Sequence, residues 1–120
     1  MNDRIQYISH QKKQILLVDF SKCSPVEVEK IARAIPESVT VQPPASVLLL
    51  ADFTKASFND EAMRALKESA VFNKRYIKKS AWVGAENFPE AFKQQLRTFS
   101  GREFPTFKSR EEALTWLVKD

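Results

Sequence analysis

The start of the chain predicts two strands from its pattern of apolar and polar residues. Residues 4–9 alternate between the two kinds, which is typical of a strand partly exposed to water. A polar connector at residues 11–13 separates them from residues 15–20, Ile-Leu-Leu-Val-Asp-Phe, which predict a buried strand. Because the connector is short, we expect the two strands to form an antiparallel hairpin.

A helix is predicted to follow this hairpin. Ser24 is suited to cap it, Pro25 to occupy its first position, and Glu27 to complete a capping box. Pro36 predicts its end, because proline lacks an amide hydrogen and its ring disturbs the preceding turn. Between these signals, apolar residues recur at helical spacing, at Val28, Ile31, Ala32 and Ile35.

The rest of the chain alternates between strand-like and helix-like segments. After a linker at residues 39–44, residues 46–52 are the most hydrophobic stretch, apolar on both faces as expected of a central strand covered on both sides. Pro105 cannot donate a ladder hydrogen bond, so the last strand should lie at a sheet edge. The other predicted elements are a helix at 60–72, a strand at 76–84, a helix from the Asn87 cap to Gly101, a strand at 102–107 and a helix capped by Ser109.

The predicted order of elements is ββαβαβαβα. Strands that alternate with helices imply right-handed crossovers and a mostly parallel sheet, to which the first strand adds in the antiparallel sense. The 120 residues contain no internal repeat or low-complexity tract. We therefore expect one α/β domain over residues 1–120.

Composition favours an ordinary globular protein of the cytoplasm. Apolar residues make up 43% of the chain and charged residues 28%, a mixture that argues against disorder. No apolar run approaches the roughly 20 residues that span a bilayer, and the first residues lack the apolar core of a signal peptide. Cys23 is the one cysteine, so no internal disulfide can form, and we expect it to pack as a small apolar side chain. The net charge of +4 is modest.

Residues 52–63 read DFTKASFNDEAM and carry a family likeness. They resemble the motif D-L-S-x-x-x-F-M-D-S-S-G of bacterial anti-sigma-factor antagonists, with Asp52, Thr54, Phe58 and Asp60 in register with identical or similar residues. Those proteins are STAS domains, whose order of elements is the one predicted here. The resemblance implies a STAS-like fold and a protein-interaction or regulatory role.

The antagonists are switched by phosphorylation of the second serine of D-S-S-G, and that position is Ala62 here. Met63 replaces the glycine, and Glu61 replaces the first serine. Glu61 places a permanent negative charge in the first helical turn, either as a helix-capping carboxylate or as an imitation of a phosphorylated surface. Thr54 and Ser57 are nearby hydroxyls that either stabilise the turn or accept a phosphate.

The C-terminal stretch at residues 107–117 reads FKSREEALTWL. It is similar to the ending of the SpoIIAA-like (STAS/SEC14-type) group of uncharacterised bacterial proteins. This second likeness implies a bacterial protein of the same fold, with an alternative role as a small-molecule or lipid-binding domain.

The chain lacks the residues that several common kinds of catalytic or cofactor site need. Gly84 and Gly101 are the two glycines, far apart, so the chain has no glycine-rich phosphate loop or dinucleotide fingerprint. One histidine and one cysteine cannot build a zinc site of the usual kind. His10 has no acid or nucleophile near it in the sequence, and no G-x-S-x-G motif supports it. We expect no enzyme activity, no metal and no cofactor.

Asp19 and Asp52 each end an apolar strand, at the sheet edge where α/β proteins usually bind ligands. A response-regulator receiver domain has a similar first strand and a later strand-end aspartate that accepts a phosphoryl group. Here Phe20 replaces that family's second acidic residue, and Lys108 follows Pro105 instead of preceding a proline. We therefore expect the two aspartates to cap loops.

A basic cluster surrounds Tyr76. It either binds nucleic acid or another anionic surface, or is an ordinary solvated loop. The modest net charge favours the solvated loop, so nucleic acid is not an expected partner. The cluster consists of Lys74, Arg75, Lys78 and Lys79.

Two functions remain, and neither involves a membrane. The first is a non-enzymatic docking module that binds a protein partner or a second copy of itself through the turn after the central strand. Its predicted surface consists of Phe53, Thr54, Ser57, Phe58, Asp60 and Glu61. The second is a binder of a small apolar ligand, in a cavity between helices and sheet. Four aromatic residues would line that cavity or simply pack in the core, namely Phe88, Phe92, Phe99 and Trp116.

Overall fold

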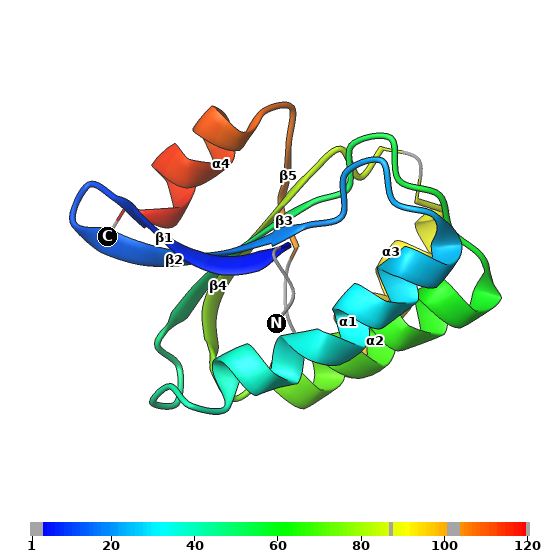
Figure 1. Ribbon diagram of the computed structural model, residues 1–120, viewed down its shortest axis with the longest axis horizontal. Helices are drawn as coiled ribbons and strands as arrows, with labels where there is room; N and C mark the ends of the chain where they lie inside the picture. Colours follow the sequence, from blue (N-terminus) through cyan, green and yellow to red (C-terminus); the bar gives the residue numbers. More distant parts are fainter. Residues whose placement is uncertain (1–3, 87, 101–103, 120) are drawn as a thin grey trace.

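The computed structural model describes residues 4–86, 88–100 and 104–119, which form a five-stranded sheet with helices on both faces (Figure 1). The predicted order ββαβαβαβα is confirmed. In chain order the elements are β1 (Ile5–His10), β2 (Lys13–Asp19), α1 (Pro25–Val39), β3 (Val47–Asp52), α2 (Asp60–Asn73), β4 (Ile77–Val83), α3 (Glu90–Ser100), β5 (Thr106–Phe107) and α4 (Arg110–Leu117).

The strands lie in the order β1-β2-β3-β4-β5. β1 pairs with β2 in the antiparallel sense, and the other neighbouring pairs are parallel, as predicted. The hairpin turns at Gln11 and Lys12, whose φ angles of 48° and 69° are those of a type I′ turn. β3 is the middle strand and all six of its residues are buried, which confirms the prediction of a central strand.

The last strand lies at the sheet edge, as Pro105 predicted, but it is short. Thr106 and Phe107 pair with Trp82 and Val83 of β4. Pro105 precedes the strand and accepts a hydrogen bond at its carbonyl from the Trp82 amide at 2.9 Å. The start of the predicted strand, at residues 102 and 103, lies outside the described residues.

The two faces of the sheet carry unequal cores. α1, α2 and α3 cover one face and α4 covers the other (Figure 1). Because successive strand residues point to opposite faces, the buried strands supply both cores. The larger core, under the three helices, includes Leu16, Val18, Phe20, Leu49, Phe53, Trp82 and Phe88. The smaller core, under α4, consists of Ile15, Leu17, Leu48, Leu50, Ala81, Val83, Ala113 and Leu117.

α1 begins as predicted and ends later than predicted. The Ser24 hydroxyl accepts a hydrogen bond from the Glu27 amide at 3.3 Å, and the Glu27 carboxylate accepts one from the Ser24 amide at 3.0 Å. The prediction that Pro36 ends the helix is wrong, because the helix continues to Val39. Proline removes one hydrogen bond near the helix end, whereas the added turn buries Val39 completely.

The other predicted helices are present. Asn59 caps α2 by accepting from the Ala62 amide at 2.8 Å, and Ser109 caps α4 by accepting from the Glu112 amide at 3.2 Å. The caps predicted for α3, Asn87 and Gly101, lie outside the described residues. No helix within the described ranges combines the length and the apolar character needed to cross a membrane.

Candidate functional site

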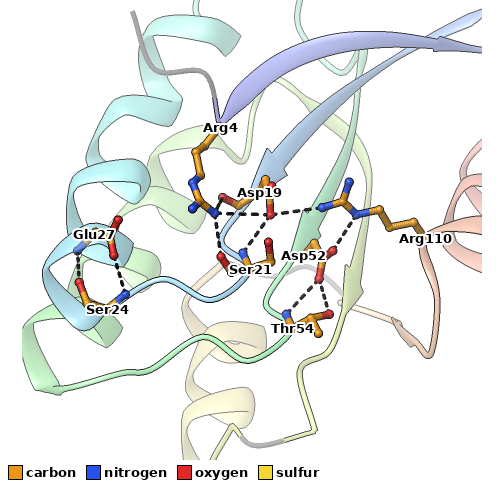
Figure 2. A network of polar contacts seen from close by, with 8 residues as sticks. All are labelled: Arg4, Asp19, Ser21, Ser24, Glu27, Asp52, Thr54 and Arg110. Carbon is orange, nitrogen blue, oxygen red and sulfur yellow. Dashed lines mark hydrogen bonds and ion pairs between the residues drawn. The ribbon is translucent and has the colours of Figure 1, made fainter.

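Two aspartates lie side by side at the carboxyl ends of the central strands. Asp19 is the last residue of β2 and Asp52 the last residue of β3, and the two are paired in the parallel register. Figure 2 shows both carboxylates at the carboxyl ends of these two inner strands, within a network of polar contacts. The Asp52 side chain is 8% exposed and the Asp19 side chain 30% exposed.

Arg110 bridges the two carboxylates. Its Nε donates to Asp52 Oδ2 at 2.7 Å, and its Nη2 lies 3.2 Å from Asp19 Oδ1. Arg110 is the first residue of α4, so the Ser109 cap places its guanidinium over the strand ends. The sequence did not indicate this contact, because Arg110 is far from both aspartates along the chain. It belongs to α4, which covers the face of the sheet opposite to α1, α2 and α3.

Arg4 approaches Asp19 from the other side. Its Nη1 donates to the Ser21 carbonyl at 2.7 Å and lies 3.8 Å from Asp19 Oδ1. Burial alone would raise the pKa of Asp19. The hydrogen bonds from Ser21 and the positive charges of Arg110 and Arg4 together outweigh burial, so the pKa of Asp19 lies below its ordinary value.

Both aspartates also cap the loops that follow them, as predicted. Asp19 Oδ1 accepts from the Ser21 amide at 2.9 Å. Asp52 Oδ1 accepts from the Thr54 amide at 3.0 Å and from the Thr54 hydroxyl at 2.6 Å. The two carboxylates are therefore bound both by these loops and by the Arg110 guanidinium. Within the described ranges, no group of three or more His, Cys, Asp or Glu side chains could hold a metal ion.

The turn between β3 and α2 is exposed, but neighbouring segments hold its backbone. The Lys22 amide donates to the Thr54 carbonyl at 2.9 Å, and the Ser57 amide donates to the Cys23 carbonyl at 2.9 Å. Gly84, with φ of 71°, lies against the same turn: a Cβ at this position would be 2.7 Å from the Thr54 nitrogen. The loops after β2, β3 and β4 are thus packed on one another.

Of the six residues predicted for the docking surface, five are exposed or half-buried and one is buried. Thr54, Ser57, Asp60 and Glu61 are exposed, and Phe58 is half-buried. Phe53 is 2% exposed, so the prediction that its ring presents an apolar contact at the surface is wrong. The ring continues the core beyond the end of β3. It stacks on Phe20 at 4.7 Å and meets Trp82 and Phe88 edge-on at 5.0 and 4.9 Å between ring centroids.

Ala62, at the position of the antagonists' phosphorylated serine, is fully buried. Its methyl group belongs to the larger core, and its amide donates to the Asn59 side chain. Glu61, one residue earlier, is exposed. At the start of α2, a carboxylate therefore faces solvent and the next side chain faces the core.

Among the described side chains, the predicted aromatic residues do not come together around one cavity. Phe88 and Phe92 are buried in the larger core, whereas Trp116 packs against the smaller core on the other face of the sheet. Phe88 and Phe92 are therefore packed in a different core from Trp116. The Phe99 side chain lies outside what the structure describes.

The remaining candidates take structural positions. Cys23 is 1% exposed, and burial raises the pKa of its thiol, as expected of a small apolar core residue. His10 ends β1 and pairs with Lys13 at the start of β2, at the opposite end of that strand from Asp19.

The strand order, mixed sheet and two-sided helix layers are those of the SpoIIAA-like fold, as predicted. The chain is similar to the crystal structure of an uncharacterized DUF3478-family protein with a SpoIIAA-like fold from Shewanella loihica PV-4, at 18% sequence identity. The TM-score is 0.68, over 94% of this chain and 91% of that one. No protein-family model matches the sequence, and no curated protein matches it significantly. The likeness shows the fold.

Proposed function

We propose that this protein is a non-enzymatic docking module of STAS-like fold that binds a partner protein through the turn after β3 and the start of α2. The docking surface consists of Thr54, Ser57, Phe58, Asp60 and Glu61. One observation carries the proposal: this exposed turn is held by backbone hydrogen bonds to Lys22 and Cys23. A surface fixed before binding loses little conformational entropy when a partner docks.

The chemistry of the surface indicates the kind of partner. Asp60 and Glu61 are exposed carboxylates in the first turn of α2, where the helix dipole favours negative charge. Phe58 is half-buried beside them, with its ring 4.5 Å from that of Phe88. A complementary partner presents basic side chains around an apolar centre.

We propose that docking does not depend on phosphorylation at the position where the antagonists carry their phosphorylated serine. Ala62 has no hydroxyl and is buried, and Glu61 beside it carries a permanent charge. Of the two nearby hydroxyls, that of Thr54 donates to Asp52. Phosphorylation of Thr54 would break that bond and set two anions together, so Ser57 is the better acceptor.

The test compares two charge reversals of the same kind. Asp60→Lys/Glu61→Lys changes the docking surface, and Glu111→Lys/Glu112→Lys changes the equivalent exposed acidic pair in the first turn of α4. Both variants lose similar helix-dipole stabilisation, about 0.3–1 kcal/mol per residue, so folding effects are matched. Partners are isolated from bacterial cytosol by pull-down, and their affinity is then measured by calorimetry with purified components.

We expect the α2 reversal to weaken binding about tenfold or more, which corresponds to about 1.4 kcal/mol, while the α4 reversal binds like the wild type. Self-association is measured on the same variants by light scattering. Equal affinity of both reversals for every partner recovered, or no partner above background together with a monomer at all concentrations, would contradict the proposal.

A further inference from the structure

A cleft with a volume of about 870 Å³ lies beside the amino-terminal half of β4. Its lining comes from the residue that follows α2, from β4 and α3, from residues 104–106 at the start of β5, and from Trp116 of α4. Small-molecule sites in proteins have volumes of about 300–1,000 Å³, so the cleft has the size of such a site. It is separate from the docking surface, and the inference is independent of the proposed function.

The cleft is strongly basic. Five cationic side chains line it, together with one carboxylate, Glu90. The basic cluster predicted around Tyr76 supplies part of this charge, and α3 supplies the rest, which the sequence did not reveal. The five cationic residues are Lys74, Lys78, Lys79, Lys93 and Arg97.

Two of these cations already have partners within the chain. Arg97 lies 3.8 Å from the Glu90 carboxylate. Lys79 donates to the carbonyls of Trp116 and Lys119 at 3.2 and 2.7 Å, and its ammonium lies 4.8 Å from the Trp116 ring centroid. The other three, Lys74, Lys78 and Lys93, make no ion pair within the part of the chain that the structure describes.

A buried hydroxyl in the lining points independently to a ligand. Ser80 is 4% exposed, and among the described residues its Oγ has no hydrogen-bond partner. A buried polar group without a partner costs about 1–3 kcal/mol. A ligand atom at the base of the cleft would supply the missing hydrogen bond.

The cleft also has apolar walls. Ile77, Phe104, Pro105 and the Trp116 ring line it between the charged groups. An inorganic anion would leave these walls in contact with water. A molecule with an anionic group and an apolar body would use both the charge and the walls.

We propose that this cleft binds a small organic anion, in which a carboxylate, sulfonate or phosphate is attached to an aromatic or other apolar body. Lys78 and Lys93 attract the anionic group, Ser80 provides a hydrogen bond, and the apolar walls hold the body.

The first experiment uses 1-anilinonaphthalene-8-sulfonate, a fluorescent aromatic anion, and N-phenyl-1-naphthylamine, the neutral molecule without the sulfonate. We expect saturable binding of the anion at one site, about tenfold or more tighter than binding of the neutral probe. Amide chemical shifts should move at residues 77–80 and 93–97. Shifts confined to the exposed apolar residues Val71 and Phe72 would overturn the proposal, since they would place the probe on α2.

Variants separate charge from folding. Lys78→Gln/Lys93→Gln should weaken binding of the anionic probe about tenfold, while Lys12→Gln/Lys30→Gln, which removes two exposed lysines elsewhere, should not. Ser80→Ala should weaken binding severalfold without lowering the unfolding temperature of the ligand-free protein, because it removes an unpartnered hydroxyl. Equal affinity in the wild type and all three variants would overturn the proposal.

A lipid headgroup presents a similar anion, so a second arm uses phosphatidylglycerol vesicles. We expect the soluble probe to bind in their absence and the protein to stay in the supernatant when the vesicles are sedimented. Sedimentation with vesicles, combined with no binding of the soluble probe, would overturn the proposal in favour of a membrane surface.

Discussion

At the carboxyl ends of β2 and β3, two carboxylates meet two guanidinium groups, whereas beside the amino-terminal half of β4 five cations face one carboxylate. In the first region Asp19 and Asp52 are held by Arg110, by Arg4 and by the loops that they cap. In the second region three lysines have no oppositely charged partner among the described residues. The charges of the first region are paired within the fold, whereas those of the second region remain available to a ligand. This is the reverse of the usual arrangement in α/β proteins, in which ligands bind at the carboxyl ends of the strands.

The largest effect should come from removing the arginine that bridges the carboxylates. Arg110→Gln leaves the Asp52 side chain, 8% exposed, without its charged partner. Breaking a buried ion pair from one side destabilises by about 3–5 kcal/mol. Because the Arg110 side chain is 40% exposed, we expect the low end, about 3 kcal/mol, in urea unfolding.

The matched change in the other region sharpens the comparison. Lys78→Gln/Lys93→Gln removes two cations of a like-charged group, so the free energy of unfolding should change by less than about 0.5 kcal/mol per residue. A loss as large as that of Arg110→Gln would show that the cleft lysines stabilise the fold as well, and the contrast between the regions would fail.

The next largest effect should come from Gly84, where the loops meet. Gly84→Ala combines a φ of 71° with a Cβ that would lie 2.7 Å from the Thr54 nitrogen. Backbone must move, and we expect a loss of about 2 kcal/mol. Amide exchange at Thr54 and Lys55 should accelerate in this variant. Ala85→Gly, which removes a buried methyl group at the neighbouring position without a clash with Thr54, is the control, and similar exchange in both variants would contradict the proposed contact.

The smallest effect should be the loss, at low pH, of the contribution that Asp19 makes to stability. The pKa of Asp19 is lower in the folded protein than its ordinary value of 3.8, so its contribution to stability is complete above that value and is lost as the pH falls through the folded pKa. The stability difference between the wild type and Asp19→Asn should therefore shrink as the pH falls from 5 towards 2. A difference that stays constant over this range would show that Asp19 makes no pH-dependent contribution.

Periodicity predicted the strands and helices because each element carries its own local signal. The run at residues 46–52 and the Ser24 capping box are such signals, and both are confirmed. The prediction from Pro36 was wrong, because the hydrogen bond that proline removes costs less free energy than the burial of Val39 contributes. The prediction that Phe53 is exposed was wrong as well, because the larger core extends one residue past the end of β3.

The site could be predicted only in part for a related reason. The aspartates are visible at the ends of apolar runs, but Arg110 reaches them through the docking of α4 on the opposite face. In the same way, Lys93 and Arg97 join the cluster at residues 74–79 through the packing of α3 beside β4. Contacts between elements distant in the sequence depend on tertiary packing, which a single sequence does not state.

α4 is attached to the sheet by the smaller apolar core and by polar contacts at its two ends. It buries Ala113 and Leu117, while Arg110 holds its start and two lysines hold the carbonyls after its end, Lys13 on Val118 at 2.9 Å and Lys79 on Lys119 at 2.7 Å. Salt screens such partly exposed charges more than it weakens apolar burial. High ionic strength should therefore loosen the two ends of α4 more than it loosens the three-helix layer, which rests on the larger core.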